Sequence, residues 1–183
     1  MTYLHFDLAV TRVTISHKER LIMNIFYTDE CPIRSAQNQC DKHVVKMILE
    51  SAQMLCSVHH RYNSKVKNLY KPTHTKHPST IWAGDSQQNY EWLYNHFIAL
   101  CDEYEHRYNR VHLTRVRLEK PLNNIPVGIP DIGMTKIRLA ITDKIFHKKC
   151  PIKSYRKYYI SKQFNFPMVW TKRTKPRWFR YVV

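Results

Sequence analysis

The sequence predicts a mainly α fold: a compact single-domain helical protein with long loops and a basic-aromatic C-terminal tail. Two long stretches, residues 39–61 and 86–108, place apolar side chains at helical spacing. Few stretches alternate apolar and polar residues as strands do, and the chain has only three glycines. A length of 183 residues with 43% hydrophobic residues is enough for one domain with a true core.

The first predicted helix, residues 39–61, carries apolar side chains around most of its circumference. A polar line nevertheless runs along it, formed by His43, Lys46, Glu50 and Gln53. Such groups are costly in apolar surroundings unless they have partners, so this line is a candidate site. The alternative is that Lys46 and Glu50 form an ordinary i, i+4 ion pair on a solvated strip.

The second predicted helix, residues 86–108, is expected to be capped by Ser79 or Ser86. Its apolar stripe consists of Tyr90, Leu93, Phe97, Leu100, Tyr104 and Tyr108. A third helix is predicted at about 152–163, and proline-containing loops at 63–80 and 120–133.

The N-terminal region allows two interpretations. Residues 2–10 alternate as a strand does, but they also fit a short helix. Met23 is a candidate start codon, because residues 24–27 read like the opening of a domain. Residues 1–22 are then a possible N-terminal extension of a domain that spans residues 23–183.

The charge is unevenly distributed. Residues 1–105 hold 11 Lys and Arg against 11 Asp and Glu, so their net charge is zero. Residues 106–183 hold 19 Lys and Arg against three acidic residues, and therefore carry the whole net charge of +16. A neutral half joined to a strongly basic half favours a polyanion-binding face, most commonly one for nucleic acid.

The basic half interleaves cations with aromatic residues, in "SYRKYYISK" and "WTKRTKPRWFRY". Cations bind phosphates and aromatic faces stack on exposed bases. The alternative role of these aromatic residues is to dock the tail on the core. The predicted DNA-binding residues are Arg156, Lys157, Tyr158, Lys172, Arg173, Lys175, Arg177, Trp178, Phe179 and Arg180.

Cysteines and histidines give weaker signals. The five cysteines are scattered, odd in number and without CxxC pairs, which argues against a disulfide framework and for a reducing, intracellular compartment. No run is long and apolar enough for a membrane span. His74, His77 and other histidines lack zinc-finger spacing, so we expect no metal and no cofactor.

Three segments in chain order resemble one family, the phage and viral pyrimidine-dimer DNA glycosylases of the endonuclease V type. "DKHVVKMILE" places Asp41, His43 and Glu50 at the spacing of that family's catalytic helix. "HPSTIWAGDSQQNYEWL" is similar to the segment that leads into its second long helix, and "KPRWFRY" to its aromatic-basic tail at the DNA. The resemblance implies a virus or phage protein that acts as a monomer on double-stranded DNA in the host cell.

The resemblance also implies site residues. Glu50 is the catalytic carboxylate, with His43 beside it and Asp41, Lys46 and Gln53 in support. The family has arginines where this chain has Leu49 and Gln53.

The family's nucleophile is the α-amine exposed by removal of the initiator methionine, which makes Thr2 the candidate. Thr2 lies far from Glu50 in sequence. A start at Met23 restores the family's distance, but Asn24 is a poor neighbour for methionine removal. The amine is then that of Met23, Lys46 or Lys42, or the chain has lost the catalytic amine.

The predicted function is a DNA repair glycosylase with AP-lyase activity on damaged DNA, with UV pyrimidine dimers as the candidate lesion. An amine attacks the sugar and a carboxylate stabilises the cation that forms. The alternatives are a nuclease or base-modifying enzyme of related fold, and a nucleic-acid-binding protein without catalysis.

Overall fold

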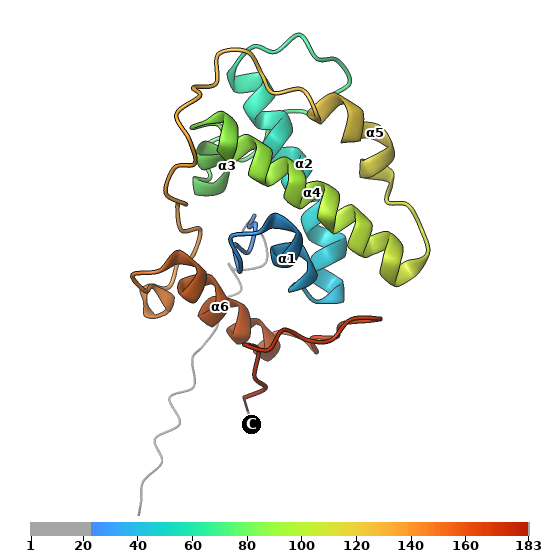
Figure 1. The fold of residues 1–183 in the computed structure, drawn as a ribbon, viewed down its shortest axis with the longest axis vertical. Coiled ribbons are helices and arrows are strands. Elements are labelled where there is room, and N and C mark those ends of the chain that lie inside the picture. Colours follow the sequence, from blue (N-terminus) through green and yellow to red (C-terminus); the bar gives the residue numbers. More distant parts are fainter. Residues whose placement is uncertain (1–22, 183) are drawn as a thin grey trace, which may run out of the picture.

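Two long helices form the centre of the molecule. The computed structural model describes residues 23–182. Helices α2 (Asp41–Arg61) and α4 (Gln87–Tyr108) cross each other and make the most extensive helix–helix contact (Figure 1). Side chains such as Met54, Leu55 and Leu93 are fully buried between the elements, so the core is built around this pair.

The ends of these helices follow capping chemistry. Asp41 stands in the first turn of α2, where a carboxylate favours the positive end of the helix dipole. Ser86 caps α4, since its hydroxyl oxygen accepts a hydrogen bond from the Asn89 N–H. Asn109, with a left-handed φ of 54°, ends α4.

Shorter elements surround this pair. They are the helices α1 (Pro32–Gln37), α3 (Pro78–Ala83), α5 (Leu113–Leu122) and α6 (Pro151–Ser161), and the 3-10 helices η2 (Lys144–Phe146) and η3 (Lys162–Phe164). Helix α1 packs against α4, while α3 and α5 lie against α2 and α4. Helix α6 lies at the opposite end of the molecule from α5 (Figure 1).

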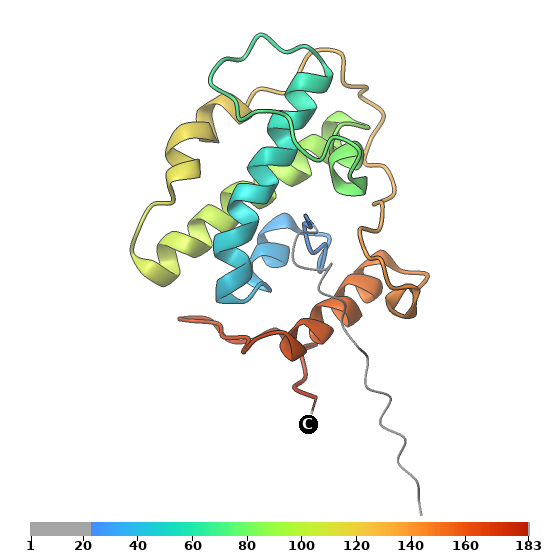
Figure 2. The ribbon, with the colours of Figure 1, turned by 180° about the vertical axis from the view of Figure 1, so that it is seen from behind.

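The two ends of the described chain both meet the first turns of α2. Residues 23–28, which form no helix or strand, are buried near α1 and α6 (Figure 1). The C-terminal segment passes below the start of α2 (Figure 2). There the Asp41 N–H donates to the Val169 carbonyl, and the Trp170 indole N–H donates to the Asn38 carbonyl.

The mainly α prediction is confirmed, and the described residues contain no strand. Three predicted helices correspond to α2, α4 and α6 within two residues at each end. The predicted strand or short helix at residues 2–10 and the extension at 1–22 lie outside the described residues. Within residues 23–182, no helix has the length and apolarity needed to cross a membrane.

Candidate active site

Two nitrogen atoms meet the carboxylate of Glu50. The backbone nitrogen of Asn24 lies 2.9 Å from Glu50 Oε2, and Lys46 Nζ lies 3.1 Å from Glu50 Oε1. Glu50 is only 8% exposed, whereas the Lys46 side chain is about half exposed. The carboxylate is therefore a buried acceptor at the edge of the core, with one nitrogen on its inner side and one toward solvent.

Helix α2 creates this setting by its side-chain periodicity. Met47 and Ile48 point into the core, while Val45 and Leu49 are exposed. Glu50 lies at the boundary between the two faces, one turn after Lys46. The i, i+4 ion pair expected from the sequence is present, but the second nitrogen comes from a segment 26 residues away.

The N-terminal segment is fixed so that the Asn24 nitrogen faces α2. Asn24 is itself buried, and its side-chain amide donates to the Ala140 carbonyl at 2.9 Å. Its side-chain oxygen accepts from the Phe26 N–H at 2.8 Å. Phe26 has a φ of 46°, which turns the chain sharply. These contacts hold the Met23–Asn24 peptide against the carboxylate.

The surroundings of Glu50 act on its pKa in opposite directions. Burial raises the pKa above its usual value, because the charged form is desolvated. The Lys46 charge, the Asn24 N–H, the Lys46 hydrogen bond and the His74 charge lower the pKa, without cancelling the effect of burial. A carboxylate whose pKa is raised in this way accepts a proton more readily than an exposed one, and can return it.

Two histidines of the segment before α3 also reach this corner. His74, with a φ of 48°, lies near enough for its charge to act on Glu50. His77 caps α3 through its ring and lies near the backbone of Met23. From the sequence, both histidines were candidates only for zinc ligands, and their position beside the N-terminal segment was not predicted. Among residues 23–182, no group of three His, Cys, Asp or Glu side chains is arranged to hold a metal ion.

His43 faces another part of the molecule. Its Nδ1 lies 2.8 Å from the Tyr159 hydroxyl on α6, and its ring contacts Phe26 and Phe166. Burial lowers the pKa of His43 to about 3, with Lys46 and Lys162 acting in the same direction. His43 is therefore neutral at working pH and joins α2 to α6.

Asp41 ties three elements together. It accepts hydrogen bonds from Arg107 at 3.0 Å and from the backbone and hydroxyl of Thr171 at 3.0 and 2.7 Å. Arg107, whose side chain is fully buried, also pairs with Glu103 at 2.9 Å. The contacts of Asp41 are thus with α4 and the C-terminal segment.

The remaining predicted catalytic and supporting residues are less informative. Gln53 is half-buried, and its carbonyl accepts a hydrogen bond from the Ser57 hydroxyl one turn later on α2. Thr2 lies outside the described residues.

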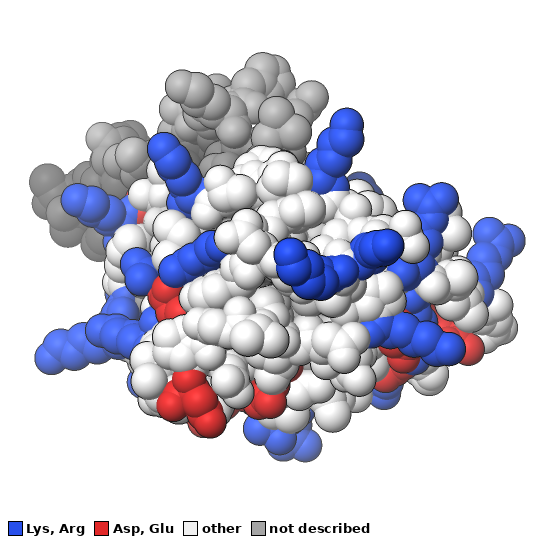
Figure 3. Space-filling model, turned by 90° about the horizontal axis from the view of Figure 1, so that it is seen from above, with Lys and Arg blue, Asp and Glu red and all other residues white. Residues whose placement is uncertain are grey.

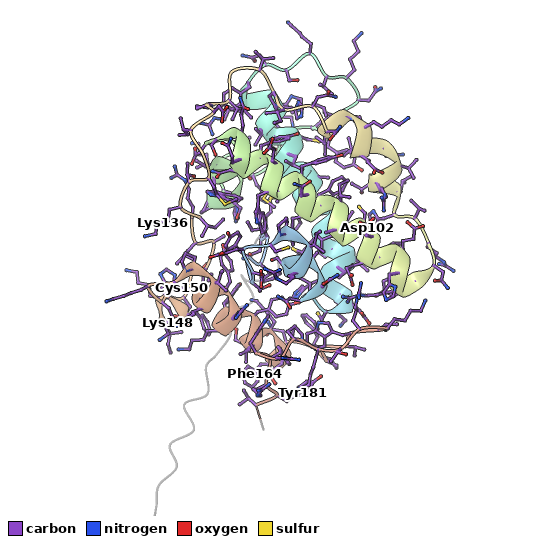
Figure 4. All side chains as sticks on the ribbon, viewed as in Figure 1. Asp102, Lys136, Lys148, Cys150, Phe164 and Tyr181 are labelled. Carbon is purple, nitrogen blue, oxygen red and sulfur yellow. The ribbon has the colours of Figure 1, made fainter. Side chains whose placement is uncertain are left out.

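The basic-aromatic tail is anchored by its aromatic residues. Phe179 is fully buried, and Tyr158 is 5% exposed. A buried ring offers no face for a base, so Phe179 serves packing and not stacking. Figure 4 shows Phe164 and Tyr181 near the lower end of the molecule, beside the C-terminal segment.

Several predicted DNA-binding cations are engaged within the protein. The Arg156 guanidinium donates to the Thr28 carbonyl, and Arg173 pairs with Glu103 at 2.6 Å. Lys172 donates to the His106 carbonyl, and Arg180 to the Arg177 carbonyl.

Other predicted cations reach solvent from the same region. Lys157, Lys175 and Arg177 are exposed, and Lys157 Nζ also donates to the Ile145 carbonyl at 3.0 Å. Trp178 is half-buried, with the Arg156 guanidinium over its ring. Figure 3 shows Lys and Arg side chains spread over one face, with the acidic side chains mainly in the lower half of that view.

The comparison with protein families finds one family that matches the chain. Residues 23–115, just over half of the chain, match the family described as pyrimidine dimer DNA glycosylase. The chain belongs to this family. The match begins at Met23 and includes α2, Glu50, both histidines and α4, whereas α6 and the tail lie beyond it. No curated protein and no solved structure matches the chain.

Sequence reasoning had passed over Asn24. Its side chain is unfavourable for removal of a preceding methionine, so the neighbouring amines seemed better candidates. The distance in sequence already indicated a terminus near Met23, at the separation from Glu50 that the family resemblance requires, but no sequence signal shows that the Asn24 nitrogen meets the carboxylate.

Proposed function

We propose that this protein is a DNA glycosylase with AP-lyase activity on damaged DNA, with UV pyrimidine dimers as its lesion. The observation that carries the proposal is the 2.9 Å contact between the Asn24 nitrogen and the Glu50 carboxylate. Membership of the pyrimidine dimer DNA glycosylase family supports the substrate class. The setting that we propose is a virus- or phage-infected cell, with the protein acting as a monomer.

The proposed nucleophile is the α-amine of Asn24. In a chain that continues through Met23, this nitrogen belongs to a peptide bond, whose resonance withdraws its lone pair. Cleavage of the Met23–Asn24 bond converts it into an amine at the same place, beside Glu50. An α-amine has an ordinary pKa near 8, so a useful fraction is neutral at physiological pH.

Two groups, the Asn24 amine and the Glu50 carboxylate, carry out the proposed reaction. The amine attacks C1′ of the damaged nucleotide, and the base leaves with the electron pair of the broken bond. Glu50 takes a proton from the new ammonium, and the nitrogen lone pair then forms the C=N bond of the iminium as the electron pair of the C1′–O4′ bond moves to O4′. Glu50 returns its proton to O4′ and is ionised again. The iminium makes the C2′ protons acidic, Glu50 takes one of them, and the 3′ phosphate leaves with its electron pair by β-elimination, which breaks the strand.

Lys46 offers a second amine at the same carboxylate, 3.1 Å from Glu50 Oε1. An ε-amine has an ordinary pKa near 10.4, so a far smaller fraction of it than of an α-amine is neutral at physiological pH. In the proposed mechanism, Lys46 is therefore the positive partner that keeps Glu50 ionised, and Asn24 is the nucleophile.

DNA binding is proposed for the exposed cations of the basic half, such as Lys157, Lys175 and Arg177. Their charges supply phosphate contacts, and the damaged nucleotide leaves the helical stack to reach the amine. The anchored aromatic residues hold this surface in place.

One observation favours a second function. The Lys46–Glu50 ion pair is what a non-catalytic nucleic-acid-binding protein would also show, with Glu50 serving only its neighbours.

The experiment that separates the two functions compares Glu50→Gln with wild type on UV-irradiated duplex. The amide preserves shape and an acceptor for the Asn24 nitrogen but cannot take a proton. We expect incision to fall by about a hundredfold or more, as is typical when a general acid–base group is lost, with unchanged DNA affinity. Glu91→Gln, an exposed position on α4, is the matched control.

Full incision by Glu50→Gln would contradict the proposed mechanism and favour the binding protein. A chelator is expected to leave wild-type incision unchanged, because no step uses a metal ion. Loss of incision on chelation would point instead to a nuclease.

A further inference from the structure

One strip of α2 faces solvent directly beside the candidate active site. It consists of Lys42, Val45, Lys46 and Leu49, all of which are exposed, and we call it the α2 strip. Residues three and four positions apart share one face of a helix, so these four side chains form a continuous surface. Glu50 lies at the buried edge of the α2 strip, directly after Leu49 in the chain.

The composition of the α2 strip differs from that of an ordinary solvent face. Val45 is 38% exposed and Leu49 is 41% exposed, one turn apart. Single exposed apolar side chains are common, but two adjacent ones form a patch. The other long helix, α4, shows the contrast, because its exposed positions all hold polar side chains. These positions are Glu91, Asn95, Asp102, Glu105 and His106.

The two apolar side chains of the α2 strip do not serve the core. Within residues 23–182, neither Val45 nor Leu49 belongs to the hydrophobic core or to the partly buried side chains that pack against it. The two cations, by contrast, are held in place. Lys42 Nζ lies 4.7 Å from the centre of the Phe166 ring, and Lys46 pairs with Glu50 at 3.1 Å.

The position of the α2 strip points to DNA as its partner. The strip presents two positive charges and no exposed acid, which suits a polyanion. It also adjoins Glu50, to which the Asn24 nitrogen lies 2.9 Å away. One helical turn rises about 5.4 Å, whereas the major groove of a DNA duplex is about 12 Å wide. A duplex that brings a sugar to Glu50 therefore also covers the α2 strip.

Extrusion of a nucleotide creates a space that an apolar side chain can fill. When a nucleotide leaves the stack, the bases on either side of it lose a stacking partner. Proteins that open the stack insert apolar side chains between base steps. A lysine ammonium would lose its hydration there, which makes Leu49 the better occupant. The Cα atoms of Leu49 and Glu50 are neighbours in the chain, about 3.8 Å apart.

We propose that Leu49 enters the base stack at the lesion and occupies the space that the extruded nucleotide vacates, with Val45 packed beside it against the neighbouring base. This inference rests on the proposed function, because it needs Glu50 to meet an extruded sugar. Leu49 performs no chemistry. It holds the stack open while the amine and the carboxylate react with the sugar.

The test uses two duplexes that carry the same pyrimidine dimer. In one duplex the dimer lies opposite its complementary bases, and in the other it lies opposite mismatched bases, which lower the energy needed to unstack and unpair it. The chemistry at the sugar is the same in both. The readout is the single-turnover rate of borohydride-trapped imine at saturating protein, so that changes in DNA affinity do not enter.

The variants change one exposed side chain each, in the form that begins at Asn24. Leu49→Ala removes the apolar side chain, Leu49→Met restores one of similar volume, and Leu49→Asn supplies a polar one. Leu113→Ala is the matched control, because Leu113 is 59% exposed on α5. None of these substitutions removes a core residue. A change in rate is therefore not a consequence of unfolding.

We expect Leu49→Ala to react about tenfold more slowly than wild type on the complementary duplex, as is typical when one contact with a base face is lost. Leu49→Met should recover most of the rate, Leu49→Asn should not, and Leu113→Ala should match wild type. On the mismatched duplex, Leu49→Ala should lie close to wild type, because extrusion no longer limits the reaction.

Three results would overturn the role of Leu49: a wild-type rate for Leu49→Ala on the complementary duplex, equal slowing on both duplexes, or full recovery by Leu49→Asn. Each of them leaves the proposed function standing if wild type is trapped and Glu50→Gln is not. Absence of any trapping with wild type would instead overturn the proposed function, and the role of Leu49 with it.

Discussion

At the scale of single residues, the proposed chemistry depends on the ionisation of Glu50. Burial raises the pKa of this carboxylate, whereas the nearby positive charges lower it. Lys46, one turn earlier on α2, is the largest of the influences that lower its pKa. The protonation of this single group therefore responds to a neighbour that need not touch the substrate.

Replacing Lys46 with Met should raise the pKa of Glu50, because the carboxylate loses its closest cation. The acidic limb of the pH–rate profile for abasic-strand cleavage should therefore move to higher pH. Lys42→Met is the matched control, since Lys42 lies over the Phe166 ring and not at Glu50. An acidic limb that stays in place in Lys46→Met would show that Glu50 does not set it.

At the scale of elements, buried polar groups fix how the helices pack against one another. Arg107 on α4 joins Glu103 one turn earlier, Asp41 at the start of α2, and the carbonyls of Gln37 and Gln39. Its side chain has no exposed surface. Removal of one partner from such a group leaves uncompensated charge in the core.

Arg107→Met should therefore lower the free energy of unfolding by about 3–5 kcal/mol, measured by urea denaturation. The control is Arg34→Met, which removes a largely exposed partner of Asp29 and should cost about 0–1 kcal/mol. Equal losses in the two variants would mean that the buried ion pairs do not organise this end of the molecule.

Buried neutral histidines also couple the elements to pH. Burial lowers the pKa of His96 on α4 to about 4, and likewise that of His59 on α2. An unfolded histidine has a pKa near 6.5, so below that value the unfolded chain binds more protons than the folded one. Stability is therefore full above about pH 6.5 and falls as the pH drops toward 4.

His96→Gln isolates one of these contributions. Between pH 6 and 4, the free energy of unfolding of wild type should fall more steeply than that of the variant, by up to about 1.4 kcal/mol per pH unit. Urea denaturation at a series of pH values measures both slopes. Parallel slopes would mean that His96 is charged in the folded protein.

At the scale of the whole molecule, the basic half should make DNA binding strongly dependent on salt. Affinity for duplex DNA should fall roughly a thousandfold between 50 and 200 mM salt if about six phosphates are contacted. Lys175→Gln and Arg177→Gln should each lower the slope of log K against log salt by about one, unlike Lys65→Gln in the neutral half. A shallow dependence for wild type would exclude the basic half as the binding face.

The helices that were predicted from the sequence are those in which apolar side chains recur at helical spacing. In helices α2 and α4 this spacing continues over several turns, and Ser86, as the capping residue, indicated where α4 starts. Helices α1 and α3 have six residues each, and α5 contains Pro121, so tertiary packing rather than periodicity determines them.

The site was predictable only within one element. Glu50 and Lys46 lie on one helix, so their spacing is visible in the sequence. Asn24 and His74 come together with Glu50 only because the N-terminal segment and the segment before α3 fold back onto α2. The spacing of residues along the chain does not predict such tertiary contacts.

The central claim is that the Asn24 α-amine is the nucleophile, and borohydride trapping tests it most directly. A form that begins at Asn24, made by cleavage of a fusion directly before this residue, is incubated with abasic duplex, reduced and mapped by peptide mass spectrometry. The full chain from Met1, with an amide at Asn24, is the control. We predict a covalent adduct on Asn24 in the first and none there in the second. An adduct on Lys46 in both forms, or no adduct in either, would contradict the claim.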